Sequence, residues 1–347
     1  MKSWSWKNNA AEFADYLTLK NRITTNLLMR EMENSMPPKK LRIGTRASQL
    51  ALWQANWVKS ELEKRYPGME VTLTKIKTIG DKILDVPLAQ VGGKGLFVKE
   101  IEEAMLRDEI DIAVHSMKDV PTDFPEGLGL HCITEREDPR DAVISRNLKF
   151  ADLPQGARIG TSALRRQAQL LKVRPDLQMV MIRGNVETRI RKLTEDNLDA
   201  VILAAAGLKR LGFTDSVGEY LDVDLSIPAI GQGALGIECR LADPVITETI
   251  AFFNHADTSY AVRAERALLK RCEGGCQVPI AAHGTVSNGQ LRLVGFIAAV
   301  DGQRSVRGEI SGPVAECLQL GIRLADQLLA EGGKAILEEV YQRPIGE

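Results

Sequence analysis

The stretch Arg42-Ile43-Gly44-Thr45-Arg46 opens a block of alternating short β runs and amphipathic helices, and it is informative because it recurs. Arg158-Ile-Gly-Thr-Ser162 repeats it at the start of a second block. Asp199-Ala-Val-Ile-Leu later repeats the pattern of Asp111-Ile-Ala-Val-His. Two similar pairs in the same order predict two similarly built domains. The alternation of strands and helices favours α/β domains, in which helices pack on a sheet.

The last hundred residues have a different pattern. Asn288-Gly289 and Asp301-Gly302 each separate β-prone runs, and both are dipeptides that type I′ hairpin turns require. A three-stranded antiparallel sheet is therefore predicted, followed by helices over Val314–Leu329 and Lys334–Val340. The predicted fold class is α/β, with two similar periplasmic-binding-protein-like α/β domains plus a C-terminal α+β domain with a three-stranded antiparallel sheet.

These patterns divide the chain into four parts. Residues 1–40 are an N-terminal extension, 41–135 plus 233–252 form domain 1, 136–232 form domain 2 with an Arg-rich cleft, and 253–347 form domain 3. Two interpretations of the extension stay open. Its apolar residues could form one helical face, or Met36 is the true start and the preceding residues are not native.

Composition sets broad limits on the class of protein. A chain of 347 residues predicts two or three domains, and 45 basic against 46 acidic residues exclude a general attraction to nucleic acid. The longest apolar run, Ala200–Leu208, is far shorter than the roughly 20 residues that cross a bilayer. Five scattered cysteines without a signal-peptide pattern predict reduced thiols in the cytoplasm. The four histidines share no metal-ligand spacing with a cysteine pair, so no metal site is expected.

The segment from Arg158 to Arg210 carries a local net charge of +6, from eight Arg and three Lys against five acidic residues. A guanidinium binds a carboxylate through two parallel hydrogen bonds, so the segment predicts a site for a polyanion. Arg165-Arg166 and Arg183-Gly184 lie at strand-to-helix junctions, where open α/β folds bind ligands. A solvated helix face is the alternative for any single Arg. Because the segment has no aromatic residue for base stacking, small carboxylates fit better than nucleic acid.

Four other segments combine loops with groups that can do chemistry. Lys118-Asp119 follows a buried strand, where an ionised carboxylate can stabilise a developing cation; a helix-capping Asp is the alternative. Gly92-Gly-Lys94-Gly95 fits a mobile loop over an active site. Cys276 follows two glycines, which break the helix and leave a thiol accessible; inert burial, the usual state of a free cysteine, stays the alternative. Gly231-Gln-Gly-Ala-Leu-Gly236 lacks the context of a dinucleotide site and predicts a flexible crossing between domains.

Together, seven separated motifs resemble those of the hydroxymethylbilane synthase family, also called porphobilinogen deaminases. The resemblance runs in order from about residue 41 to the C-terminus and covers everything but the N-terminal extension. It rests on Leu41-Arg-Ile-Gly-Thr-Arg46-Ala-Ser48, Val91-Gly-Gly-Lys94-Gly-Leu-Phe97, Val114-His-Ser-Met-Lys118-Asp119-Val-Pro121, Arg136-Glu-Asp-Pro-Arg-Asp141, Arg165-Arg166-Gln167, Arg183-Gly-Asn185 and Glu273-Gly-Gly-Cys276.

The resemblance implies a three-domain transferase of tetrapyrrole biosynthesis, which leads to heme and other porphyrins. Such enzymes condense four porphobilinogen molecules into linear hydroxymethylbilane on a covalent dipyrromethane cofactor. Each porphobilinogen carries an acetate and a propionate, so the growing chain is a polycarboxylate that an Arg-rich cleft would match. The implied partner is this small molecule, with no metal, nucleic acid or membrane, in a cytoplasmic monomer.

The resemblance also implies roles for individual residues. Cys276 would carry the cofactor through a thioether, and Asp119 and Lys118 would be catalytic. Cofactor contacts fall on Lys118, Asp119, Ser48, Thr161, Ser162, Arg165, Arg166, Arg183 and Gly184. Substrate contacts fall on Arg46, Ser48, Lys94, Phe97, Arg183, Arg189 and Arg210.

Two residues depart from the family pattern. Ala163 stands where the family often has Ser, and Gln90 stands where some members have Lys. The alternative function is a non-catalytic two-domain carboxylate-binding protein, which would explain the Arg cluster but not Cys276, Asp119 or the third domain. A phosphate-ester enzyme is a third candidate, but no carboxylate cluster for Mg²⁺ accompanies the Gly-rich loop.

Overall fold

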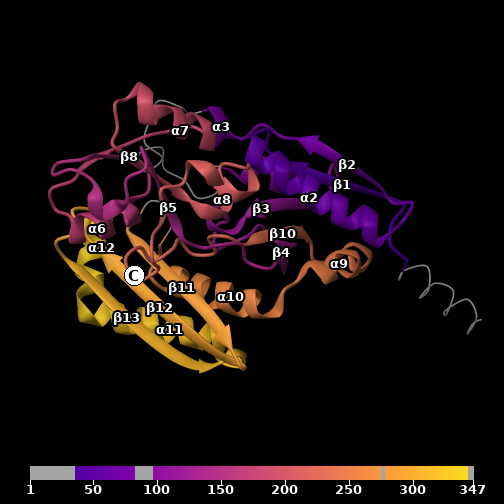
Figure 1. The fold of residues 1–347 in the computed structure, drawn as a ribbon. Helices are drawn as coiled ribbons and strands as arrows, with labels where there is room; N and C mark the ends of the chain where they lie inside the picture. The colour runs from indigo at the N-terminus through magenta and orange to yellow at the C-terminus, as the bar shows by residue number, and fades with distance from the viewer. Residues whose placement is uncertain (1–35, 83–96, 275–277, 343–347) are drawn as a thin grey trace, which may run out of the picture.

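The computed structural model describes residues 36–82, 97–274 and 278–342, which form three sheets with hydrophobic cores around them (Figure 1). Residues 1–35 of the N-terminal extension, together with Gln90, Lys94 and Cys276, lie outside the described residues. The expectations for these residues therefore stay predictions.

The first sheet has the strand order β2-β1-β3-β10-β4. Strands β1, β2 and β3 are parallel, and β10 runs antiparallel between β3 and β4. Its strands are β1 (Lys40–Thr45), β2 (Glu70–Lys75), β3 (Ile112–Ser116), β4 (Leu128–Ile133) and β10 (Leu235–Arg240). Its helices are α2 (Gln49–Arg65), α3 (Ile79–Lys82), α5 (Lys99–Leu106), the 3-10 helix η1 (Met117–Asp119), α9 (Pro244–Ile250) and η4 (Ala251–Phe253).

The second sheet has the order β7-β6-β8-β5-β9, and β5 runs antiparallel between β8 and β9. Its strands are β5 (Asp141–Ser145), β6 (Arg158–Gly160), β7 (Gln178–Val180), β8 (Ala200–Ala204) and β9 (Glu219–Tyr220). Its helices are η2 (Phe150–Asp152), α6 (Leu164–Val173), α7 (Val186–Glu195), α8 (Ala205–Arg210) and η3 (Thr214–Ser216). Both sheets thus share one topology, in which the antiparallel inner strand comes directly after a crossing between the domains.

The repeated sequence patterns occupy equivalent places in the two sheets. Arg42 N–H donates to the Asp111 carboxylate at 2.7 Å, and Arg158 N–H donates to the Asp199 carboxylate at the same distance. Ile43 is opposite Ile112 in the first sheet, as Ile159 is opposite Ala200 in the second. The sequence repeats therefore mark a real structural repeat, and the prediction of two similar α/β domains is confirmed.

The third sheet is antiparallel, with the order β11-β12-β13, and two helices cover one of its faces (Figure 1). Its strands are β11 (Ile280–Ser287), β12 (Gln290–Ala298) and β13 (Ser305–Pro313). Helix α10 (Ala256–Arg271) precedes the sheet. The sheet is followed by η5 (Val314–Glu316), α11 (Cys317–Leu328) and α12 (Lys334–Tyr341), and η6 (Leu329–Gly333) joins the last two. The predicted C-terminal α+β domain is confirmed.

One of the two predicted hairpin turns is correct. Asn288 and Gly289 both have positive φ, 51° and 72°, as a type I′ turn needs. At the second hairpin the prediction is wrong, because of the two residues only Gly302 has positive φ, 75°. Ala299 N–H instead bonds to Arg304 C=O at 2.9 Å across a longer loop, which Gly302 N–H tightens by bonding to Ala299 C=O.

The second crossing between domains, residues 229–234, is buried and hydrogen-bonded rather than loose as predicted. Gly231 N–H donates to Glu265 at 2.6 Å, and the Gln232 amide donates to Asp141 at 2.9 Å. A Cβ at Gly231 would lie 2.7 Å from Met117 Cβ, so the backbone needs glycine to pass this close to η1. Two small apolar clusters, around Met117 and around Phe296, also join domain 3 to the other two domains.

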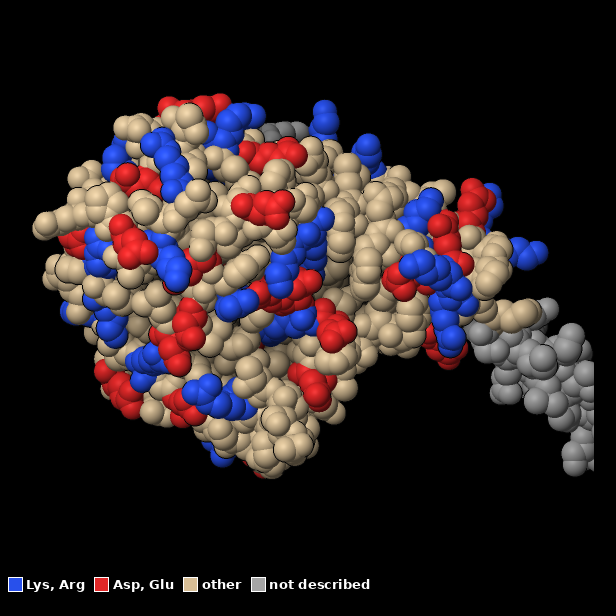
Figure 2. Space-filling view, in the orientation of Figure 1, with Lys and Arg blue, Asp and Glu red and all other residues tan. Residues whose placement is uncertain are grey.

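The molecular surface mixes both signs of charge. Figure 2 shows Lys and Arg alternating with Asp and Glu over the face in view. Among the described residues, no helix combines the length and the apolar composition that crossing a membrane takes.

Candidate active site

A buried methionine, Met117, precedes Lys118 and Asp119 and fixes the turn that carries them. Met117 is 1% exposed, and its N–H donates to Ala234 C=O of the returning crossing at 3.0 Å. The 3-10 turn that follows leaves Lys118 half-buried and Asp119 exposed. The strand end thus presents one cation and one carboxylate from domain 1.

Lys118 lies in a strongly charged environment. Its pKa is lowered to about 8, mainly by burial; Asp119 and Asp141 oppose the shift, and the positive charges of Arg166 and Arg165 add to it. These interactions cross from domain 1 to the first turn of α6 in domain 2. The structure therefore brings the predicted lysine and the predicted arginine pair together.

The guanidinium groups of Arg165 and Arg166 are buried and share the carboxylate of Asp141. Arg165 donates to both Asp141 oxygens at 2.7 and 2.9 Å, and Arg166 Nε donates at 2.9 Å. Burial disfavours an ionised Asp141, but the two guanidinium charges outweigh it and hold the pKa of this carboxyl well below its usual range. One carboxylate faces two guanidinium groups, so the cluster keeps a positive charge that reaches Lys118.

Arg183, Gly184 and Arg189 lie together at the start of α7. Arg189 Nε donates to Gly184 C=O at 2.8 Å, and Gly184 has φ of 114°, a conformation that favours glycine. The pKa of Arg189 is lowered to about 10, mainly by burial, with Arg166 and Arg183 adding to the shift and Asp119 opposing it. Cations crowded enough to lower one another's pKa are what a bound polyanion would relieve.

Arg46 and Phe97 of domain 1 contact each other, and Arg210 at the end of α8 contacts domain 1 residues. The Arg46 guanidinium lies over the Phe97 ring at 4.2 Å. Arg210 lies over Trp53 at 5.8 Å and donates to Gly233 C=O at 2.7 Å, and burial lowers its pKa to about 10. Trp53 was not predicted, although it lies on α2 only five residues after Ser48.

The two strand-to-helix junctions differ in their caps. Ser48 caps α2, where its side chain accepts the Ala51 N–H at 3.3 Å. Ala163 occupies the same place before α6 and makes no side-chain cap, whereas the buried Thr161 hydroxyl accepts the Ala163 N–H at 3.3 Å. Thr161 thus compensates in part for the missing family serine, while Ser162 is half-buried beside it.

The four cysteines within the described ranges are all buried. Burial raises the pKa of Cys132, Cys239 and Cys272 to about 12, which leaves almost no reactive thiolate at neutral pH. Cys276 is the fifth cysteine of the sequence. Chemistry at these four thiols is therefore disfavoured, while Cys276 stays a sequence-based prediction.

Sequence reasoning missed the organising role of Asp141. It is fully buried and also accepts hydrogen bonds from Ser226 at 2.8 Å and from the Gln232 amide at 2.9 Å. The signal that could have found it is the position of a lone acid at the head of the apolar run Ala142-Val-Ile144. Asp141 therefore fixes the orientation of both guanidinium groups.

Fold and site together define a three-domain α/β protein in which cationic side chains of the first two domains act on one another, a grouping suited to a polycarboxylate. Known proteins agree with this class. The family described as "Porphobilinogen deaminase, dipyromethane cofactor binding domain" matches residues 41–248, and "Porphobilinogen deaminase, C-terminal domain" matches residues 259–330. The chain belongs to the porphobilinogen deaminase family.

Curated relatives are similar over nearly their whole length. Porphobilinogen deaminase of Pelobacter propionicus is 82% identical over 310 residues, 89% of this chain and 100% of the relative. That of Geobacter sulfurreducens is 82% identical over 306 residues, 88% of this chain and 96% of the relative. Among solved structures, the aliphatic sulphonate binding protein SsuA of Escherichia coli has a TM-score of 0.35 and 17% identity over 67% of this chain and 70% of that chain, a likeness too low to carry an argument.

Family membership settles the general activity. The chain is a transferase, a hydroxymethylbilane synthase of tetrapyrrole biosynthesis, and its N-terminal two domains match the part of the family that binds the dipyrromethane cofactor. The predicted family, activity and cofactor are confirmed, and the alternative of a non-catalytic carboxylate-binding protein is set aside.

Proposed function

We propose that the synthase reaction takes place between the turn Lys118-Asp119 of domain 1 and the arginine cluster of domain 2. The observation that carries this proposal is that charges from both domains act on Lys118, whose pKa burial, Arg166 and Arg165 lower against Asp119 and Asp141. The donor set fits the cofactor and substrate, because pyrrole acetate and propionate groups are carboxylates that guanidinium groups bind in pairs. Porphobilinogen is the substrate that binds there.

The dipyrromethane cofactor, when bound, supplies a primer with a free end for new pyrrole units. Arg183, Arg189 and Arg210 bind carboxylates: burial lowers the pKa of the last two to about 10, both stay charged at neutral pH, and a bound anion would stabilise these partly desolvated charges. Arg46, stacked on Phe97, adds a further donor on the domain 1 side. Lys94, in the Gly-rich segment, is proposed as a substrate contact from the sequence alone.

Asp119 acts on the reacting pyrrole. When porphobilinogen loses ammonia, positive charge develops on its ring nitrogen, and an adjacent fixed carboxylate lowers the barrier electrostatically and can accept the ring N–H proton. Its exposed position at the end of η1 leaves it open to a ligand in the cleft. Lys118 binds a carboxylate next to it. Arg165 and Arg166 set the positive potential of the same cleft, oriented by Asp141.

The anchoring residue is Cys276, and intact mass tests it. Protein denatured before mass measurement should carry a surplus of two pyrrole units, because a thioether survives unfolding. Cys276→Ser should lose the surplus, and Cys272→Ala, which removes a buried thiol whose pKa is raised to about 12, should keep it. The anchor assignment fails if Cys276→Ser keeps the surplus.

We also propose that the enzyme works in the cytoplasm as a monomer. Sedimentation at micromolar concentration would test the monomeric state.

A further inference from the structure

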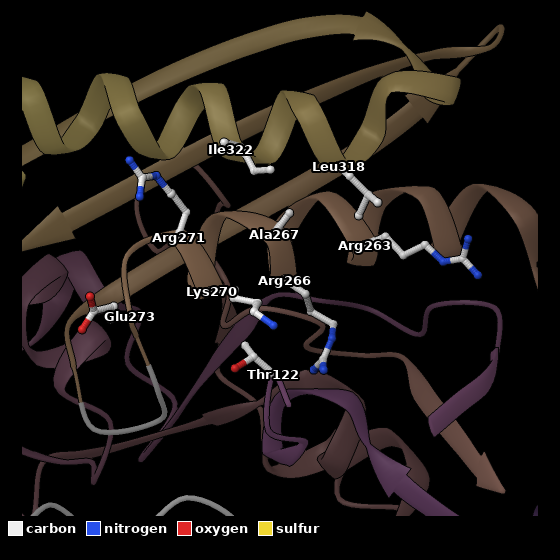
Figure 3. A pocket seen from close by; sticks show the side chains of 9 residues that line it. All are labelled: Thr122, Arg263, Arg266, Ala267, Lys270, Arg271, Glu273, Leu318 and Ile322. Atoms are coloured by element: carbon white, nitrogen blue, oxygen red, sulfur yellow. The ribbon is translucent and has the colours of Figure 1, made fainter. Parts of the chain in front are cut away.

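A second site lies away from the residues assigned to catalysis. A cavity of about 610 Å³ opens between α10, α11 and the loop that follows η1 (Figure 3). Its volume falls in the range of small-molecule pockets. None of the residues lining it belongs to the candidate active site described above.

Four cations from α10 line this cavity: Arg263, Arg266, Lys270 and Arg271. Residues 263, 266 and 270 share one helix face, since three- and four-residue spacings bring side chains together. In Figure 3, Arg263 and Arg271 extend at opposite ends, with Arg266 and Lys270 between them near Thr122. Glu273 is the single carboxylate of the lining, so the positive charge dominates.

The four cations are not equally available to a ligand. Lys270 pairs with Asp123 at 2.6 Å, Arg271 pairs with Asp326 at 2.6 Å, and Arg266 donates to Val120 C=O at 3.0 Å. Arg263 is exposed and makes no hydrogen bond or ion pair with any residue that the structure describes. Arg263 is therefore the donor that an incoming anion can use without breaking an existing contact.

The opposite wall of the cavity is apolar. Leu318 and Ile322 lie four residues apart on one face of α11 and are 49% and 42% exposed. Figure 3 shows both side chains pointing from α11 towards α10. Covering them would gain free energy in proportion to the apolar area removed from water. An inorganic anion would leave this wall in contact with water, whereas an organic anion would cover it.

We propose that this cavity binds a small organic molecule that carries carboxylates on an apolar ring. The carboxylates contact Arg263 and the neighbouring cations of α10, and the ring packs on Leu318 and Ile322. The proposal does not depend on the residue roles assigned in the active site. Pyrrole carboxylates of the pathway and unrelated aromatic acids share this chemistry, so the test includes one of each.

Calorimetric titration of the holoenzyme with benzene-1,3-dicarboxylate tests the site. The wild type should bind it saturably at a site distinct from any binding to the active-site arginines, and benzene-1,3-dicarboxamide and inorganic sulfate should bind at this site at least about tenfold more weakly, since each lacks one half of the recognition. Arg263→Gln and Ile322→Thr should each weaken binding of the dicarboxylate about tenfold or more. Arg323→Gln is the matched control, because it removes an exposed cation on α11 that pairs with Glu316 and does not line the cavity.

The outcomes separate this cavity from the catalytic cleft. Loss of binding in both cavity variants but not in Arg323→Gln supports the proposal. Absence of saturable binding, equal weakening by the control, or the same number of sites and the same affinity in Arg263→Gln as in the wild type would overturn it, since all dicarboxylate would then bind outside this cavity. In a parallel titration with porphobilinogen, binding is compared after the heat of turnover has been subtracted. Tighter binding of porphobilinogen to the wild type than to Arg263→Gln would assign the site to the pathway. A site that binds benzene-1,3-dicarboxylate more tightly than porphobilinogen would be assigned to foreign aromatic acids. Turnover measured alongside should be the same in Arg263→Gln and the wild type.

Discussion

Asp119 and Lys118 are adjacent in sequence, carry opposite charges and have different proposed roles in the active site. Asp119 is exposed at the end of η1, and in the proposed reaction its carboxylate stabilises the positive charge that develops on the pyrrole nitrogen. Asp119→Asn keeps the shape but removes the charge, and kcat should fall about 100- to 1000-fold with an unchanged circular dichroism spectrum. Asp123→Asn, four residues later and paired with Lys270, is the control and should keep near-normal kcat. A near-normal kcat in Asp119→Asn would contradict the role.

Lys118 predicts a pH dependence. Burial lowers its pKa to about 8, so the ammonium is charged below this pH and its contact with a carboxylate is lost as pH rises above it. We expect kcat/KM for porphobilinogen, which reports the free enzyme, to fall above about pH 8. Lys118→Arg keeps its charge over this range, so its alkaline limb should move to higher pH. The assignment would be wrong if both enzymes lost activity at the same pH.

Helix α5 carries a buried acid that makes the stability of its contact with the first sheet depend on pH. Glu102 is 8% exposed and lies near the buried pair His115–Glu238, whose atoms are 2.9 Å apart. Burial raises the pKa of Glu102 to about 7, Glu238 raises it too, and His115 opposes the shift. The folded protein therefore holds this proton more tightly than the unfolded chain, whose Glu has its ordinary pKa.

The sign of the effect follows from this raised pKa. Its stabilising contribution is fully present below the unfolded pKa near 4.5 and is lost as pH rises through about 7. At 1.36 kcal/mol per pKa unit, the loss amounts to at most about 3 kcal/mol. Glu102→Gln should flatten the fall of Tm between about pH 5 and pH 8, and Glu103→Gln, its exposed neighbour, should follow the wild type. Parallel curves for all three proteins would exclude Glu102 as the titrating group.

Elements marked by local signals could be predicted from the sequence. Ser48 stands directly before an apolar-periodic run, a sequence signal for the start of a helix, and α2 spans Gln49–Arg65 with Ser48 as its cap. The Asn288-Gly289 turn succeeded for the same reason, because its positive φ values are a local demand of the dipeptide. The Asp301-Gly302 turn failed because β12 and β13 separate earlier, at Ala298 and Ser305, and leave a longer loop.

Partners that are distant in sequence could not be predicted in this way. Asp141 meets Arg165 across 24 residues and Gln232 across 91, and only the packed domains decide that one carboxylate serves both. The sequence therefore indicated which arginines could form an anion site, but not that Asp141 binds two of them. The sequence predicts a flexible crossing at Gly231, and this prediction is wrong for the same reason. The acceptor of the Gly231 N–H, Glu265, belongs to another domain and is distant in sequence.

At the scale of the whole molecule, one buried carboxylate of domain 3 joins both crossings between the other two domains. Glu265 on α10 is fully buried and accepts the N–H of Gly231 at 2.6 Å, a guanidinium N–H of Arg136 at 2.8 Å and the N–H of Gly284 in β11 at 2.8 Å. Arg136 follows β4 on the outward crossing, and Gly231 precedes β10 on the return. This single group therefore links all three domains, alongside the apolar clusters that join domain 3 to the other two.

Glu265→Gln tests this link, because it keeps the size of the side chain but leaves the buried Arg136 guanidinium without its counter-charge. Removing one partner of a buried ion pair costs about 3–5 kcal/mol. The three cores themselves lose no apolar contact, so the loss should appear first in the crossings. Hydrogen exchange measured by mass spectrometry should rise strongly in the peptide covering residues 229–234 and little in β12. Glu309→Gln, which breaks an exposed pair with Arg292 within the same domain, should change exchange little in either segment, since such pairs contribute about 1 kcal/mol or less. Equal exchange of the crossing in both variants would mean that apolar contacts alone, such as those of Met117 and Ala234 with Val262, hold the domains in place.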